Sequence, residues 1–248
     1  LNDAMGIETR IGGFYSVFWT VVTTAVTTGS VNTTLAAMNP LVILSGFIGM
    51  LVQSTPGGKG VGLMYSVMYI VITVFIVGLM SGRTPEYLGI KVTSRDVKIV
   101  MVAFLIHPLI ILVPTIIAYA GGFVSAIGVG QDPIGFTQIL YEYTTSAANN
   151  GSDFLGTTAN TPFFNISTAL VIFVGRYAPI GLLLGLAGSM IGRKRSTEVS
   201  GGLRTDSFAF SAVLIGSIII LVALTFFPFL GLGPIASYFE GNVNGFGT

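Results

Sequence analysis

The sequence predicts an all-α polytopic membrane protein, assembled from repeats of a helix, a re-entrant pore loop and a second helix. Of its 248 residues, 52% are hydrophobic and 8% are charged, and the mean hydropathy is +0.85. A soluble domain carries roughly 25% charged residues, so this composition fits a chain surrounded by lipid. The re-entrant element is predicted by residues 143–156 (YTTSAANNGSDFLG), a polar, glycine-bearing stretch between two strongly apolar segments.

Four apolar runs are long enough to cross a bilayer as helices, which requires about 20 residues. They are residues 63–80, 97–120, 163–190 and 208–229. Two other runs, 13–24 and 38–52, are too short for simple crossings. The second precedes a cluster of glycines between residues 56 and 62, and we interpret it as half of a helix that is broken there. Broken helices of this kind recur at ion sites near the bilayer midplane.

Residues 136–148 predict a short helix that runs directly into the polar stretch. Irregular backbone at membrane depth is tolerated only where protein encloses it or where it lines water. We therefore expect this segment to dip into the membrane and to return on the side from which it entered. An ion pathway is the working hypothesis.

Basic residues are concentrated in two loops, which the positive-inside rule places in the cytoplasm. We predict that loops 81–98 and 191–206 are cytoplasmic and that 121–160, which has no Lys or Arg, lies on the outer side. Two crossings separate the basic loops, so the polar stretch between these crossings must enter and leave on one face. The basic residues are Arg83, Lys91, Arg95 and Lys98 in the first loop, and Arg193, Lys194, Arg195 and Arg204 in the second.

The polar loop has a weaker copy near the start of the chain, where TTAVTTGSV (23–31) also follows a short apolar and aromatic segment. Rings of backbone carbonyls that dehydrate K⁺ need a loop without crowding side chains, which glycine allows. An ordinary capped helix end followed by a turn would use the same residue types. We predict that K⁺ is held at Gly29 and Gly151, within ion-binding loops formed by Thr27, Thr28, Gly29 and Ser30 and by Asn149, Asn150, Gly151 and Ser152.

Charged residues near these loops suggest further roles. Arg176 lies near the middle of the run 163–190, and an intramembrane cation usually faces a cavity or a partner. We expect it to act as a positive gate or to pair with a carboxylate; snorkelling toward an interface is the alternative. Lys59, within the glycine cluster, is interpreted in the same way. Asp153 either raises the local cation concentration or is a solvated loop residue.

Several other classes of site find little support. The chain has no cysteine, which excludes disulfides and cysteine-ligated metals, and its net charge of +1 argues against nucleic acid as a partner. His107 is the single histidine and is expected to be a packed or capped structural residue. An intramembrane hydrolase would need Ser152 or Ser30 beside this histidine, which belongs to a separate helix.

The string GLMSGRTPEYLG (78–89) resembles the signature of the potassium-translocating, potassium-binding A subunit of the Kdp-type potassium-transporting ATPase. The similarity extends over nearly the whole chain. TTAVTTGSV (23–31) and SAANNGS (146–152) resemble that subunit's third and fourth filter loops, and FVGRYAPI (173–180) resembles the segment with its pore-side arginine. ANTPFFN (159–165) and ALTFFPFLGLGPIASY (223–238) also match. The GRTPEYLG string is highly specific, whereas the loops alone are weak evidence.

The resemblance implies four pore repeats related to potassium channels and to the Trk/Ktr/HKT transporters. Residues 1–92 then form the third pore repeat, 93–196 the fourth, and 197–248 a cytoplasmic loop and the final transmembrane helix. K⁺ is implied as the transported ion, with no organic cofactor and with Arg176 below the filter. A separate P-type subunit, which hydrolyses ATP, small accessory subunits and an N-terminal half of the pore are the implied partners in the plasma (inner) membrane. No residue of this chain resembles a nucleotide-binding or phosphorylated-aspartate motif, so no catalytic residue is assigned.

Three positions depart from the family pattern. Gln53 replaces a glutamate, Lys59 adds a charge to the glycine stretch, and Ala148 replaces the first of three asparagines. Gln53 therefore joins Arg176 and Lys59 as a predicted pore-side residue. Two alternatives stay open beside an ATP-driven potassium translocating subunit: half of a Trk/Ktr-like channel that uses no ATPase, and a non-conducting structural subunit.

Overall fold

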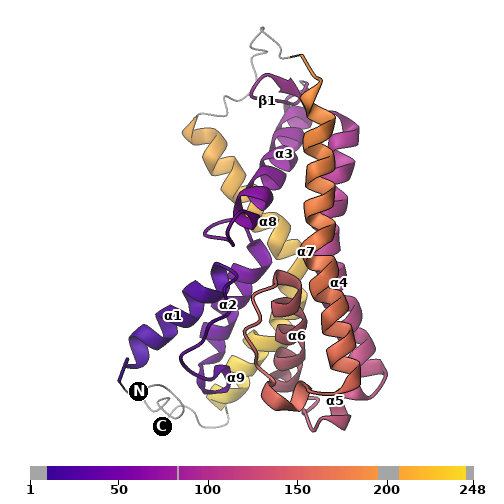
Figure 1. Cartoon of the computed structure of the whole chain (residues 1–248). Coiled ribbons are helices and arrows are strands. Elements are labelled where there is room, and N and C mark those ends of the chain that lie inside the picture. Colours follow the sequence, from indigo (N-terminus) through magenta and orange to yellow (C-terminus); the bar gives the residue numbers. More distant parts are fainter. Residues whose placement is uncertain (1–9, 83, 195–206, 244–248) are drawn as a thin grey trace.

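The computed structural model describes residues 10–82, 84–194 and 207–243, which form helices of very different lengths joined by loops (Figure 1). Arg83, Arg195 and Arg204, which the charge argument uses, lie outside the described residues. In chain order the elements are α1 (Gly13–Ala25), η1 (Leu35–Ala37), α2 (Pro40–Val52), α3 (Val61–Ser81), β1 (Glu86–Tyr87), β2 (Ile90–Lys91), α4 (Ser94–Ala120), α5 (Phe123–Ala126), α6 (Pro133–Ala148), η2 (Gly156–Ala159), α7 (Pro162–Ile191), α8 (Phe208–Leu230), η3 (Gly231–Ile235) and α9 (Ala236–Val243).

Within the described residues, four helices are long and apolar enough to cross a membrane: α3, α4, α7 and α8. This confirms the predicted all-α polytopic membrane protein. The first three agree with the predicted crossings to within a few residues. The fourth is longer than predicted, because the helix continues past Pro228 and Pro234 to Glu240. The π-helical turn η3 carries it into α9, and such turns accommodate local strain in an otherwise regular helix.

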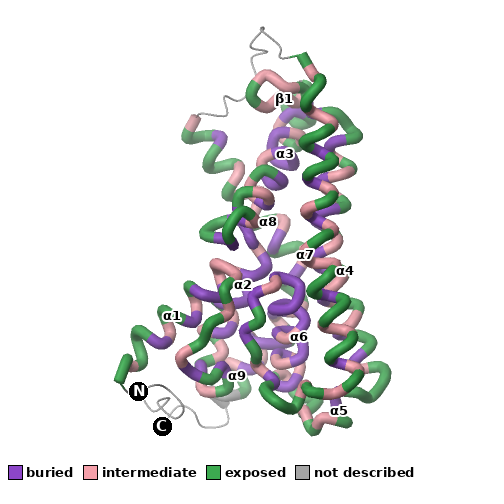
Figure 2. The backbone as a smooth tube through the Cα atoms, in the orientation of Figure 1, coloured by how far each residue is buried: buried purple, intermediate pink, exposed green. Residues whose placement is uncertain are grey.

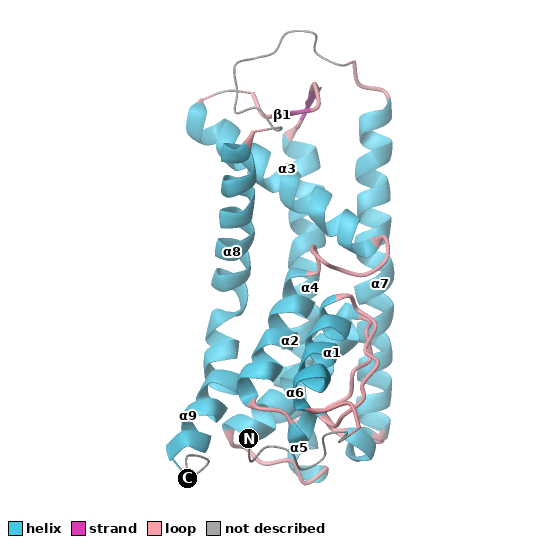
Figure 3. Cartoon of the chain, turned by 90° about the vertical axis from the view of Figure 1, so that its left-hand side faces the viewer, coloured by secondary structure: helices cyan, strands magenta, loops and turns pink. Residues whose placement is uncertain are grey.

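The helices α1, α2 and α6 are much shorter than α4 and α7. α6 begins beside α5, at the end of the molecule that α4 reaches, and the loop that follows it returns to that end before α7 starts (Figures 1 and 3). The start of α6 is fixed locally, because Asp132 Oδ1 accepts the Gly135 N–H at 2.9 Å and Pro133 occupies the first helical position. The segment from α6 to the start of α7 therefore begins and ends at the same end of the molecule, and its re-entry into a membrane stays a prediction.

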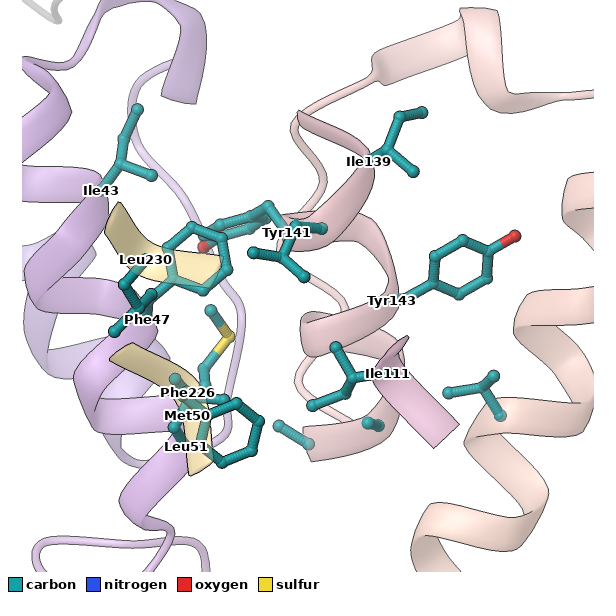
Figure 4. Close-up of a cluster of buried hydrophobic side chains, with 14 of the residues drawn as sticks. Ile43, Phe47, Met50, Leu51, Ile111, Ile139, Tyr141, Tyr143, Phe226 and Leu230 are labelled. Carbon is teal, nitrogen blue, oxygen red and sulfur yellow. The ribbon is translucent and has the colours of Figure 1, made fainter. Parts of the chain in front are cut away.

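The main core is built around α6, which is buried along most of its length (Figure 2). Side chains from α2, α4 and α8 converge on it (Figure 4). Tyr141 of α6 meets Phe47 of α2 edge to face, with ring centroids 5.1 Å apart. In lipid, apolar surface gains little by leaving one apolar environment for another, so close packing and internal hydrogen bonds hold this core together.

Two parts of the chain repeat the same local geometry at a constant spacing. Left-handed residues follow α1 at Thr27 and Gly29, and they follow α6 at Asn149 and Gly151, with φ between 55° and 69°. Each later residue lies 122 positions after its counterpart (149 minus 27, 151 minus 29). The weak sequence repeat therefore corresponds to two copies of one backbone conformation.

The helices after these loops begin in register as well. Pro40 opens α2 and Pro162 opens α7, again 122 positions apart (162 minus 40), and a side chain caps each helix just before the proline. The copies then diverge: α2 ends at Val52 and Gln53 adopts a left-handed conformation (φ 52°), whereas α7 continues to Ile191. The predicted half-helix α2 therefore corresponds to the first part of α7, and the first copy is interrupted where the second copy continues as one helix.

An ion pair joins the start of α4 to the residues just after α7, at the end of the molecule away from α5 (Figure 1). Arg193 Nη2 donates to Asp96 Oδ1 at 2.8 Å and Nη1 donates to Oδ2, while Asp96 also accepts the backbone N–H and the hydroxyl of Thr93, both at 2.8 Å. The hydrogen bonds with Asp96 raise the pKa of the Arg193 guanidinium above its ordinary value. From the sequence, Arg193 was predicted only to be a cytoplasmic cation, and its pairing with Asp96 was not predicted. The spacing of Thr93 and Asp96 is that of a capping box, which the sequence does indicate.

The GRTPEYLG string (82–89) supplies the first strand and the turn of a small antiparallel hairpin, in which β1 pairs with β2 just after the string. Leu88 and Gly89 form its two-residue turn with φ values of 51° and 76°, as a type I′ turn requires. Gly78 of α3 lies tight against Pro85, where an added Cβ would approach the proline ring to 3.0 Å. The hairpin was not predicted, because strands of two residues each are too short to show an alternating pattern.

Candidate functional site

The loop after α6 is fixed by its backbone and by its own side chains. The N–H of Asn149 donates to Ser146 O and that of Asn150 donates to Thr145 O, the pair of bonds that defines a Schellman motif. Behind the loop, Thr145 Oγ1 donates to Asn150 Oδ1 at 2.7 Å, and Ser152 Oγ lies 2.9 Å from the Tyr141 hydroxyl. Asn150 and Ser152 thus brace the backbone from behind rather than presenting their side chains freely.

The loop after α1 has the same backbone pattern without this bracing. The N–H groups of Thr27 and Thr28 donate to Thr24 O and Thr23 O, as in the second copy. The hydroxyls of Thr23 and Thr24, however, donate to carbonyls of their own helix. Thr28 and Ser30 are exposed. The first loop therefore depends on neighbouring segments for its support.

One such support is the second loop. A Cβ added at Gly29 would lie 1.8 Å from Asn150 O and 2.8 Å from Ser152 N, so only glycine allows the two loops to touch here. Another support is the break after α2, where a Cβ at Gly58 would lie 2.1 Å from Thr27 Oγ1. The structure thus brings together both predicted ion-binding loops and the glycine cluster.

A small cavity lies beneath the end of α6. Gln53, Asn149 and Arg176 line it together with Ala147 and Ala148. Its volume of about 10 Å³ is close to the minimum for one water molecule. The carbonyl end of a helix carries partial negative charge, so the end of α6 favours a cation in this cavity.

Arg176 is half-buried and has no hydrogen-bond or ion-pair partner in the described part of the chain. It reaches the cavity because α7 approaches α6 closely at Gly175, where a Cβ would lie 2.5 Å from Ala147 O. Lys59 is exposed and does not line this cavity. Of the three predicted pore-side residues, the structure therefore places Gln53 and Arg176 together and Lys59 apart.

Gln53 has a partner that the sequence analysis did not identify. Its Nε2 lies 3.4 Å from Nε2 of His107. His107 is buried, as expected for a structural histidine, but it contacts a residue of the candidate site. The residue pair is 54 positions apart, so no local sequence pattern could have indicated it.

A second cavity, with a volume of about 230 Å³, lies on the other side of the braced loop. Glu142, Asn150, Gly151 and Asp153 contribute to its lining. Asp153 is not simply a solvated acid, because its Oδ1 accepts the N–H groups of Leu155 and Gly156 at 2.8 and 2.9 Å and so shapes the turn into η2.

The hydroxyls considered for a hydrolase are not arranged for catalysis. Ser152 Oγ lies among Tyr141, Thr145 and Asn150, whereas His107 pairs with Gln53. A nucleophilic serine needs a base within hydrogen-bond reach, and His107 does not supply one here.

Comparisons with known proteins agree with this geometry. A family model described as the potassium-transporting ATPase A subunit matches residues 2–239. Three curated relatives are named potassium-transporting ATPase potassium-binding subunit. They come from Alicyclobacillus acidocaldarius (46% identical over 235 residues, covering 95% of this chain and 42% of the relative), Geobacillus kaustophilus (45% over 233 residues, 94% and 42%) and Gloeobacter violaceus (44% over 235 residues, 94% and 40%).

The chain therefore spans about two-fifths of the length of these relatives. The match covers the GRTPEYLG string, both loops and the segment with Arg176, so the resemblance suggested by the sequence is confirmed. This multi-pass membrane chain belongs to the potassium-transporting ATPase A subunit family.

Proposed function

We propose that this chain forms two of the pore repeats of a subunit that binds K⁺ and translocates it across the membrane. The observation that carries the proposal is the contact between the two repeated loops, where Gly29 lies against the backbone of Asn150. Loops of one conformation whose backbones meet in this way can present backbone carbonyls toward a shared path. The names of the relatives supply the ion, because they are potassium-binding subunits.

The transported ion is K⁺, held by the loops at Gly29 and Gly151. Thr27, Thr28 and Ser30 belong to the first loop, and Asn149, Asn150 and Ser152 belong to the second. The bonding of Asn150 and Ser152 within the protein supports a bracing role for these side chains. Carbonyl oxygens of the loops then replace the water around the ion.

Arg176 acts as a positive gate beneath the loops. Its place beside the carbonyl end of α6 supports this role, since a guanidinium there competes with a cation for the same partial negative charge. Gln53 shares that cavity. Lys59 does not line it and acts at another point of the ion route.

The subunit works in the plasma membrane as part of an ATP-driven uptake complex. A separate P-type subunit hydrolyses ATP, and small accessory subunits join the complex. The distribution of basic residues supports a cytoplasmic position for loops 81–98 and 191–206 and an outer position for 121–160. α6 and its loop then form a re-entrant segment from the outer side.

The third pore repeat is formed by residues 1–92 and the fourth by residues 93–196, and the last loop and helix are formed by 197–248. The first two repeats correspond to the part of the relatives that this chain does not cover. The exposure of α1 supports this arrangement. Counterparts in α6 are buried at Thr137, Leu140 and Tyr141, whereas an aromatic face of α1 is between 48% and 76% exposed at Phe14, Tyr15, Phe18 and Trp19.

The test is K⁺-dependent growth of a host that lacks potassium uptake. The host expresses this chain with the complementary N-terminal part of a relative and the ATPase subunits. Wild type should restore growth at low K⁺, and Gly29→Asp or Gly151→Asp should abolish it. Gly60→Asp is the matched control, because Gly60 also has a positive φ (78°) and has open space around its Cα.

Growth that survives both loop substitutions would sink the assignment of the ion path. Rescue that does not require the ATPase subunits would favour the Trk/Ktr-like alternative. Absence of rescue by the wild-type chain, despite normal assembly, would favour a non-conducting structural subunit.

A further inference from the structure

The break between α2 and α3 leaves backbone carbonyls without intrahelical partners, and Gln53 and His107 meet beside it. α2 ends at Val52, so the carbonyls of its last turn must find other donors. Tyr69 donates its hydroxyl to one of them, Val52 O, at 3.2 Å. His107 itself is only 4% exposed and packs between Tyr65 and Phe226.

The contact with Gln53 determines the protonation pattern of this ring. An amide nitrogen only donates, so the ring nitrogen that Gln53 Nε2 meets must accept and carries no proton. A neutral imidazole has one N–H, which then belongs on Nδ1.

This bond fixes which end of the Gln53 side chain meets the cavity. With its nitrogen held by His107, Gln53 directs its oxygen elsewhere, and no described residue donates to that oxygen. Asn149 is arranged in the same way, because its Nδ2 donates to Ser146 O and Ala147 O at 3.2 and 3.1 Å. Both amides line the cavity beneath the loops.

We propose that His107 is a positioning residue, which holds Gln53 so that the cavity beneath the ion-binding loops receives an amide oxygen instead of an amide NH₂. An oxygen can coordinate a cation that leaves the loops, whereas an NH₂ group would repel it. The role toward the cation rests on the proposed passage of K⁺. The first test measures only the protonation of the His107 ring and does not depend on transport.

The single histidine of the chain makes a direct measurement possible. The whole chain, labelled with ¹⁵N in the histidine ring and reconstituted in lipid, should give one pair of ring nitrogen resonances at neutral pH. We expect a protonated Nδ1 and a hydrogen-bonded, unprotonated Nε2. In Gln53→Met, the Nε2 resonance should shift to that of a free acceptor while Nδ1 stays in place. Gln131→Met, the same substitution at an exposed glutamine, should change neither resonance.

A proton on Nε2, or an Nε2 resonance that does not respond to Gln53→Met, would overturn the inference. This holds whether or not the chain transports K⁺, so a failure of the proposed function would be recognised separately by the absence of wild-type uptake.

The functional arm uses the assembled complex. His107→Gln keeps an acceptor near the position of Nε2 and should retain uptake, whereas His107→Leu should weaken apparent K⁺ affinity by about fivefold, the effect of one hydrogen bond. Gln53→Met should match His107→Leu, and the double variant should lose no more than either alone. Equal loss in His107→Gln and His107→Leu would indicate a packing role only and would overturn the positioning role.

Discussion

At the scale of single residues, two neighbouring threonine hydroxyls at the end of α6 have different hydrogen-bond partners. Thr145 and Thr144 are neighbours in α6 and are both buried, yet their hydroxyls do different things. Thr145 Oγ1 bonds to Asn150 Oδ1 and lies 3.1 Å from Ser152 Oγ, whereas Thr144 donates to Leu140 O of its own helix. The pair separates the bracing of the loop from the stability of the helix.

Thr145→Val should therefore lower the free energy of unfolding by about 1–2 kcal/mol, because it leaves buried polar partners in the loop unsatisfied. It should also reduce the preference for K⁺ over Na⁺ in uptake by the assembled complex, because the loop loses its rear support. Thermal unfolding in detergent and uptake with competing Na⁺ measure the two effects. Thr144→Val is the matched control; an identical loss of selectivity in it would argue against bracing by Thr145.

At the scale of elements, the ion pair of Asp96 and Arg193 couples α4 to α7. Asp96 is fully buried, whereas the Arg193 side chain is 23% exposed. Removing one partner of a buried pair costs about 3–5 kcal/mol, because the other charge is left without compensation. The partial exposure of Arg193 places Asp96→Ala near the lower end of this range, since the freed guanidinium regains water.

We expect Asp96→Ala to destabilise the chain by about 3 kcal/mol in thermal unfolding, and the double variant with Arg193→Ala to lose little more. Arg95→Ala removes an exposed charge from the neighbouring position and should be close to neutral. Fully additive losses from the two single variants would show that the pair is not coupled.

The sequence predicted those elements whose signals are local. Run lengths identified α3, α4 and α7, and turn residues identified both loops, because the Schellman ends at Thr27 and Asn149 depend on neighbours in the chain. Contacts between distant segments were not predictable in this way. The bond from Gln53 to His107 spans 54 positions and that from Asp96 to Arg193 spans 97, and neither follows from a periodic pattern.

At the scale of the whole molecule, the proposed topology depends on whether α6 crosses the membrane. Gln131 precedes α6 and Thr157 follows its loop, and both side chains are exposed. Re-entry puts these two residues on the same side of the bilayer. A crossing by α6 would put them on opposite sides and would also separate Arg95 from Lys194, contrary to the positive-inside rule.

The absence of cysteine from the sequence allows single-cysteine labelling without background. Gln131→Cys and Thr157→Cys should both react with a membrane-impermeant maleimide in intact cells, and Arg95→Cys and Lys194→Cys should react only after permeabilisation. Each site is exposed, so a failure to react reports sidedness instead of burial. Labelling of Gln131→Cys and Thr157→Cys from opposite sides would mean that α6 spans the bilayer.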